Sequence, residues 1–273
     1  MQSTPAKFHR TGFTLMEMMV VIAIITVLAA IAYPLIARMR ANANKLFALN
    51  RMKNLAAAAN TYAGTHNGML PSEDVVGADG WASSITPEAE KTWYNALPRQ
   101  MGEKALSDFV KEGRQADFYT KQSILFLPGA SYPTNQRNVK PLFAIAINTK
   151  LHRKARKVDG QKDPAGLKSD LNISTIQLPS RTVLFLEQGL PGESRAHPTI
   201  AKGDYDGSCK GSAKSFVARY TGRGIIAFCD GHADEVSAKD ILGTDGRIIW
   251  DDTMATNNQS ATFWTADPKE DPN

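Results

Sequence analysis

Two cysteines in the C-terminal half of the chain, Cys209 and Cys229, are the side chains with the most obvious covalent chemistry. In an oxidising compartment we expect them to form a disulfide, which closes a loop of about 20 residues and stabilises the fold by roughly 3 kcal/mol. Thiolates also bind zinc, and His197 and His232 would complete a tetrahedral ligand set with them. The sequence leaves zinc open as the less favoured alternative.

Carboxylates near the same segment suggest a second kind of metal site. Asp204 and Asp206 lie among turn-forming glycines, and Asp230 and Asp234 would join them if the two cysteines were bridged. Calcium takes about six to eight oxygen ligands in proteins, so two neighbouring carboxylates are too few to form a complete loop. These four aspartates are candidates for calcium, and the sequence requires no cofactor.

A basic run in the middle of the chain could contact an anionic polymer such as DNA or a polysaccharide. Its cations are Lys150, Arg153, Lys154, Arg156 and Lys157. The run has no interleaved aromatic residues on which bases would stack, and a net charge of +5 is too small to indicate a nucleic-acid-binding protein. We therefore expect a solvated loop and predict no specific nucleic-acid partner.

Catalytic motifs are missing from the sequence. It contains neither Gly-x-Ser-x-Gly nor His-Glu-x-x-His, and the histidines are scattered at positions 9, 66, 152, 197 and 232. An anchored enzyme would need one clustered set of nucleophile, base or metal ligands. We predict that the protein is not an enzyme.

An apolar run from Phe13 to Ala32 contains one charged residue, Glu17. About 20 residues in a helix span the hydrocarbon core of a bilayer. A carboxylate at the centre of a membrane costs about 2–3 kcal/mol, so we expect Glu17 to have a cationic partner. The run passes into a helical pattern without the small-residue cleavage site of a secretory signal peptide. The sequence predicts a retained transmembrane helix.

The residues from Thr11 to Glu17 resemble the processing site of type IV prepilins and of type II secretion pseudopilins: Thr-Gly-Phe-Thr-Leu-Met-Glu follows a basic leader. In that family a prepilin peptidase cuts after the glycine and methylates the new N-terminal residue, which implies these roles for Gly12 and Phe13. The resemblance also implies that Glu17 neutralises the Phe13 ammonium of a neighbouring subunit during assembly. Pro34 stands where many members have a helix-bending proline.

The same resemblance implies partners and a location. The partners are the prepilin peptidase, copies of the chain or other pilin-like subunits, an inner-membrane assembly platform and the lipid bilayer. It places a cytoplasmic leader before a single span of the inner (cytoplasmic) membrane, with the rest in the periplasm or outside the cell after assembly. Basic residues both precede and follow the span, so the positive-inside rule does not decide the orientation.

The elements after the span predict an α+β fold, with a long N-terminal helix followed by a globular head containing an antiparallel sheet. Apolar residues after Pro34 recur at helical spacing until Gly64 and the Asn-Gly-Met-Leu-Pro run that follows. A short helix is expected over Glu103–Lys111, and Thr86-Pro87-Glu88 is typical of another helix start. The predicted strands are Ser123–Leu127, Leu142–Ile147, Thr182–Glu187, Gly224–Phe228 and Arg247–Trp250. The sequence divides into five predicted segments. They are a leader (1–12), a membrane helix (13–33), its amphipathic continuation (34–66), the head (67–262) and a flexible tail (263–273).

A second resemblance lies near the C-terminus. The segment from Tyr220 to His232 resembles a pilin-like signature in which a histidine is followed by nine residues and then Asp-Gly, often with a further histidine. Tyr220 stands in place of the first histidine, so an imidazole role is lost, whereas a structural hydrogen bond is still available. Asp230 and Gly231 are also explained by a hairpin turn, with Ala233–Val236 as the returning strand.

Two functions follow from these observations. The favoured one is a structural pilin-like subunit that is processed at Gly12 and assembled through its N-terminal helix into a type IV pilus-like filament or a type II secretion pseudopilus. The alternative is a membrane-anchored extracytoplasmic module that presents its basic run to an anionic polymer. Removal of residues 1–12 and the addition of one methyl group would distinguish the first function from the second.

Overall fold

The computed structural model describes residues 15–75, 80–151 and 171–273. Its first element, α1 (Leu15–Thr65), is one α-helix of 51 residues. Contacts divide the chain into two compact units, Met1–Ala43 and Asn44–Asn273. We call the second unit the head. The head therefore includes the last part of α1, which the sequence assigned to a separate segment ending at residue 66.

The first unit contains the apolar part of α1. Every residue from Leu15 to Ala43 is exposed, and the most apolar 18-residue window of α1 has a mean hydropathy of 2.7. By length and composition this helix can cross a membrane. Pro34 lies inside α1 without ending it, although proline cannot donate the usual backbone bond to the carbonyl four residues earlier. The predicted long apolar helix is confirmed.

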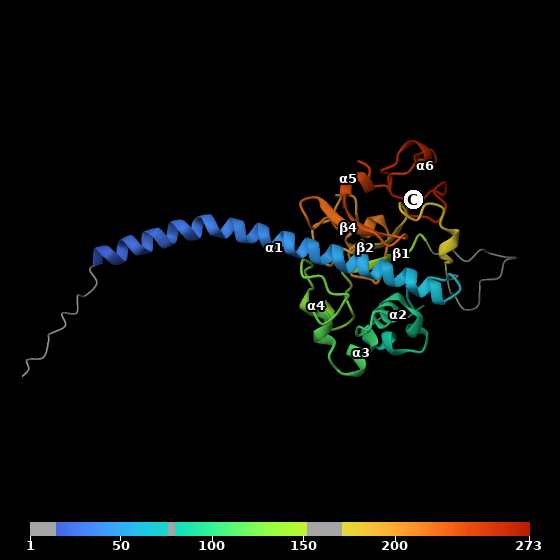
Figure 1. Cartoon of the computed structure of the whole chain (residues 1–273), viewed down its shortest axis with the longest axis horizontal. Helices are drawn as coiled ribbons and strands as arrows, with labels where there is room; N and C mark the ends of the chain where they lie inside the picture. Colours follow the sequence, from blue (N-terminus) through green and yellow to red (C-terminus); the bar gives the residue numbers. More distant parts are fainter. Residues whose placement is uncertain (1–14, 76–79, 152–170) are drawn as a thin grey trace, which may run out of the picture. The chain divides into compact units, whose positions relative to one another are not determined.

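A mixed five-stranded sheet forms the centre of the head, with the order β3-β1-β2-β4-β5 (Figure 1). Its strands are β1 (Ile145–Asn148), β2 (Val183–Glu187), β3 (Lys210–Gly211), β4 (Arg223–Phe228) and β5 (Ala233–Ser237). The pairs β1–β2, β2–β4 and β4–β5 are antiparallel, whereas β3 runs parallel to β1. The α+β class is confirmed, but the sheet is mixed because the short edge strand β3 joins in the parallel direction.

Both faces of the sheet are covered, which explains why β1, β2 and most of β4 are buried along their length. Alternate residues enter two clusters, so that Ile225 and Ala227 share one with α1 while Ile226 enters the other. The second cluster contains residues of C-terminal segments, including Phe216 and Trp264. The register of β2 on β4 shifts between Val183 and Phe185, a bulge that interrupts the alternation on β2.

Short helices make up much of the remaining head, and Figure 1 shows α2 and α3 (green) on one side of α1. The α-helices are α2 (Trp93–Gln100), α3 (Leu106–Lys111), α4 (Thr134–Arg137), α5 (Ala238–Ile241) and α6 (Met254–Asn257). The 3-10 helices are η1 (Trp81–Ile85), η2 (Glu88–Lys91), η3 (Gln115–Tyr119), η4 (Ile173–Thr175), η5 (Lys202–Asp204) and η6 (Ala213–Ser215). The predicted helix over Glu103–Lys111 is confirmed in its second part as α3.

Two strands predicted for the head are not formed. Ser123–Leu127 forms successive turns, in which the Phe126 amide donates to the Ser123 carbonyl at 3.3 Å. Arg247–Trp250 contributes only an isolated bridge rather than a strand. Phe263, at the start of the segment expected to be flexible, is buried and exchanges backbone hydrogen bonds with Arg181 and Val183.

Candidate functional site

The part of α1 in the head presents a narrow buried stripe. Ala48, Met52, Leu55, Ala59 and Ala63 recur at three- or four-residue steps and are buried. They share a core cluster with residues of β1, β2 and β4. Most of these side chains are small, which lets the helix backbone approach the sheet closely. We call this arrangement the seat of α1.

The β4–β5 hairpin lies beside the seat. The Lys45 ammonium is 3.0 Å from a carboxylate oxygen of Glu235 on β5. At the turn of the hairpin, Gly231 has a φ of +100°, and a Cβ at this position would lie 3.1 Å from the amide nitrogen of Asn60 on α1. The predicted Asp-Gly hairpin is therefore present, and its glycine meets both a conformational and a steric requirement.

The other residues of this turn stabilise it locally. Asp230 accepts hydrogen bonds from the backbone amide of His232 at 3.1 Å and lies 2.6 Å from its Nδ1. The His232 ring stacks on Phe228 with 4.4 Å between the ring centroids. These contacts explain the Asp-Gly-His sequence as a hairpin turn that borders α1.

Tyr220 contacts a carboxylate inside the head. Its hydroxyl donates to Oε1 of Glu187 at 3.1 Å, and the Glu187 side chain is fully buried. Oε1 also faces Nη1 of Arg219 at 3.3 Å, while Oε2 accepts the Ile225 backbone amide at 2.8 Å. Burial, and then the charge of Glu187, raise the pKa of the Tyr220 hydroxyl above its ordinary value. Tyr220 therefore keeps the proton that it donates.

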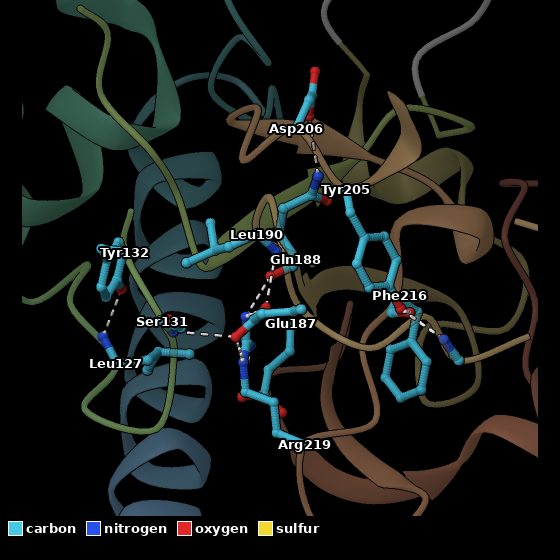
Figure 2. Close-up of polar contacts among 12 residues, drawn as sticks. Leu127, Ser131, Tyr132, Glu187, Gln188, Leu190, Tyr205, Asp206, Phe216 and Arg219 are labelled. Atoms are coloured by element: carbon cyan, nitrogen blue, oxygen red, sulfur yellow. Dashed lines mark hydrogen bonds and ion pairs between the residues drawn. The ribbon is translucent and has the colours of Figure 1, made fainter. Parts of the chain in front are cut away.

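Arg219 joins Glu187 to a second carboxylate (Figure 2). Its guanidinium binds Glu193 through two bonds, at 3.0 and 2.6 Å, and donates to the Gln188 carbonyl at 2.7 Å. Glu193 in turn accepts the backbone amides of Ser131 at 3.1 Å and of Leu190 at 2.8 Å. We call Glu187, Arg219, Glu193 and Tyr220 the buried polar network.

Charge pairing accounts for the burial of these ions. Burial acts to raise the pKa of Glu187, and Arg219 together with the hydrogen-bond donors opposes that rise. Burial likewise acts to lower the pKa of Arg219, but the charges of Glu187 and Glu193 raise it above its ordinary value. A buried ion pair is tolerated when further hydrogen bonds satisfy its remaining polar atoms, as they do here.

The disulfide prediction is wrong in this structure. Cys209 and Cys229 are free, and both are buried. Cys209 precedes β3 and Cys229 follows β4, and the sheet order puts β1 and β2 between these two strands. Three strand spacings are about 14 Å, whereas bridged cysteines have Cα atoms less than about 7 Å apart. Burial raises the pKa of both thiols, which disfavours the thiolate form.

The predicted metal ligands are not brought together. Asp204 accepts the Ala201 amide at 3.1 Å, Asp206 accepts the Ser208 amide at 2.8 Å, and Asp234 lies in β5. His197 bonds Thr199 at 2.7 Å. Across residues 15–75, 80–151 and 171–273, no group of three or more His, Cys, Asp or Glu side chains could hold a metal ion.

Several predicted site residues cannot be placed. Gly12 and Phe13 lie outside the described residues, as do the polymer-binding candidates Arg153, Lys154, Arg156 and Lys157. Glu17 is exposed in the first turn of α1. Lys150 lies just after β1, and its backbone amide donates to the side chain of Asn148 at 3.0 Å.

The sequence analysis missed the buried polar network. Glu187 ends a continuous apolar strand, and a carboxylate there is a signal that it is buried and paired. Arg219 immediately precedes Tyr220 in the signature and is the cation that such a carboxylate needs. Glu193 carries no comparable local signal, because only the folded chain brings it to Arg219.

One comparison with known proteins is informative. Residues 7–33 match the family described as the prokaryotic N-terminal methylation motif. Neither a curated protein nor a solved structure matches the chain significantly. The matched residues include Gly12, Phe13 and Glu17 and run into the exposed apolar part of α1. This N-terminal segment is that of a type IV prepilin-like protein.

Proposed function

We propose that the protein is a structural pilin-like subunit. A prepilin peptidase cleaves it after Gly12 and methylates Phe13, and α1 then assembles into a type IV pilus-like filament or a type II secretion pseudopilus. The head faces the periplasm, or the cell exterior after assembly. The observation that carries this proposal is the match of residues 7–33 to the methylation motif, directly continuous with an exposed apolar helix.

The exposed apolar helix supports assembly. Side chains from Leu15 to Ala43 are exposed around the whole circumference of α1, so this segment needs lipid or other helices around it. Cleavage creates an ammonium at Phe13, and Glu17 of a neighbouring subunit would neutralise it where either charge alone is costly. Both environments, bilayer and filament core, supply apolar contacts to the same segment.

The head supports a structural rather than a catalytic role. The carboxylates of Glu187 and Glu193 accept backbone amides and bind Arg219, and the side chains of Glu187 and Arg219 are almost completely buried. Groups held in this way are not available to a substrate. They hold the loops around the seat of α1.

Processing is tested by intact mass measurement on protein extracted from membranes of cells that contain a prepilin peptidase. We expect wild-type protein to lack residues 1–12 and to carry one methyl group. Gly12→Leu should retain the leader, whereas Gly64→Leu is the matched control, because a Cβ at Gly64 meets no atom within 4 Å. Cleavage of the Gly12 variant at the same bond would contradict the proposal.

Assembly is tested separately with Glu17→Ala. Cleavage should persist, since the glycine is unchanged, while incorporation into filaments should fall because the partner of the Phe13 ammonium is lost. Glu88→Ala removes an exposed carboxylate of the head and is the matched control. Wild-type incorporation of the Glu17 variant would show that docking does not need this carboxylate.

A further inference from the structure

The buried carboxylate of Glu187 depends on a complete set of donors. Arg219 and Tyr220 face one oxygen, and the Ile225 amide faces the other. Removing a donor from a buried charged acceptor leaves part of its desolvation cost uncompensated. Tyr220 supplies one of these bonds through its hydroxyl.

A strained turn follows Tyr220. The Tyr220 amide donates to the Arg223 carbonyl at 2.8 Å, and the Arg223 amide returns a bond at 3.1 Å, so Thr221 and Gly222 form a two-residue turn. Both have positive φ, 53° and 81°. Left-handed backbone is common for glycine but rare for a β-branched residue such as threonine. Such a conformation persists where surrounding contacts impose it, and the hydroxyl bond of Tyr220 is one of these contacts.

Gly129 lies close both to Tyr220 and to α1. A Cβ on Gly129 would be 3.5 Å from the Tyr220 hydroxyl oxygen and 3.6 Å from Cβ of Asn44, the first α1 residue of the head. The segment 127–132 is thus adjacent both to Tyr220 and to α1. Its Ser131 amide is bonded to Glu193, the other carboxylate of the buried polar network.

We propose that Tyr220 is a positioning residue. By donating to Glu187, its hydroxyl fixes the carboxylate on Arg219 and on the Ile225 amide, and through this network it holds segment 127–132 beside α1 at Asn44. The requirement at position 220 is a hydrogen-bond donor that reaches Glu187, which tyrosine supplies and phenylalanine does not. This inference concerns the head alone and goes beyond the proposed function.

The test is hydrogen exchange, resolved to single amides, on the full chain in detergent micelles. In Tyr220→Phe, exchange at the Ile225 and Ser131 amides should accelerate by roughly ten- to a hundredfold, because a hydrogen bond to a charged group is lost. Tyr33→Phe removes the same hydroxyl from a side chain that is 79% exposed, and should change neither amide.

The outcomes distinguish a hydrogen-bonding role of the Tyr220 hydroxyl from a packing role of its ring. Wild-type exchange in Tyr220→Phe would show that the aromatic ring suffices, and would overturn the proposal. The same substitution is then made in a Glu187→Gln background, to test whether the hydroxyl acts through the carboxylate. There, adding Tyr220→Phe should accelerate exchange much less than in wild type if the hydroxyl acts through the carboxylate, and equally if it does not.

Discussion

The two parts of α1 belong to one continuous helix and yet have opposite surroundings. From Leu15 to Ala43 every side chain is exposed, including Leu28 and Ile31. From Asn44 to Thr65 a stripe of mostly small apolar residues is buried, while Lys53 and Asn54 remain exposed. The more apolar part is therefore the exposed one within the single chain.

This difference shows that hydropathy and burial report different things. A one-sided stripe predicts packing against the chain's own sheet, because only one face of the helix needs cover. A helix that is apolar all round needs cover on every side, which lipid or other helices can supply. Substitutions at matched positions in the two parts test this difference.

The largest effect is expected in the buried stripe. Leu55→Ala should lower the free energy of unfolding of the head by about 2–5 kcal/mol, because it leaves a cavity at a fully buried position. Leu28→Ala makes the same chemical change at a residue 61% exposed and should leave the unfolding of the head unchanged. Urea denaturation in detergent, followed by tryptophan fluorescence, measures both. Equal losses of unfolding free energy in the two variants would contradict the difference in burial between the two parts of α1.

Membrane insertion should show the reverse pattern. Ile25→Arg places a charge in the apolar part of α1 and should cost about 2.5–3.5 kcal/mol of insertion free energy near the centre of the membrane. Ala57→Arg, at an exposed position of the head part of α1, should leave insertion unchanged. The inserted fraction can be measured by alkali extraction of membranes. Normal insertion of the Ile25 variant would argue against a spanning role for this part.

A smaller effect is expected at the turn that borders the seat. Gly231→Ala should destabilise the head by about 1–3 kcal/mol, since a side chain at positive φ is strained and its Cβ crowds Asn60. Gly102→Ala is the control for backbone strain alone, because Gly102 has a φ of +72° and no atom within 4 Å of an added Cβ. Thermal unfolding of both variants separates the two causes, and an equal loss would exclude a contribution from the contact with α1.

The smallest effect is expected at the exposed edge of the seat. Lys45→Ala removes an ion pair with Glu235, which keeps a second cation, Arg223, at 3.2 Å. Partly exposed pairs contribute roughly 0.2–1 kcal/mol, and salt screens them. The loss in unfolding free energy should therefore shrink as salt is added, while Lys53→Ala should show no such dependence. A larger loss that does not respond to salt would mean that the lysine stem contributes by packing.

Features that depend on neighbouring residues could be predicted before the fold was known. The prepilin-like segment, α1, and strands β1, β2 and β4 could be predicted because their signals are local: residue order, apolar length, and short buried runs between turn residues. The hairpin after β4 was predictable for the same reason, since Asp-Gly favours that turn.

Contacts between segments that are distant along the chain could not be predicted in this way. The order of the strands separates Cys209 from Cys229, although their spacing along the chain permits a bridge. An isolated bridge between Thr182 and Phe263 places Phe263 beside the start of β2. The C-terminal segment, although mostly polar and rich in proline, is therefore packed at its beginning. The pairing of β2 with β4 brings Glu187 close to Arg219. Because the Glu187 carboxylate is buried, it also needs the hydrogen bonds that Tyr220 and Ile225 donate. Pairing between strands is set by the whole core rather than by local propensity, and no local pattern specifies it.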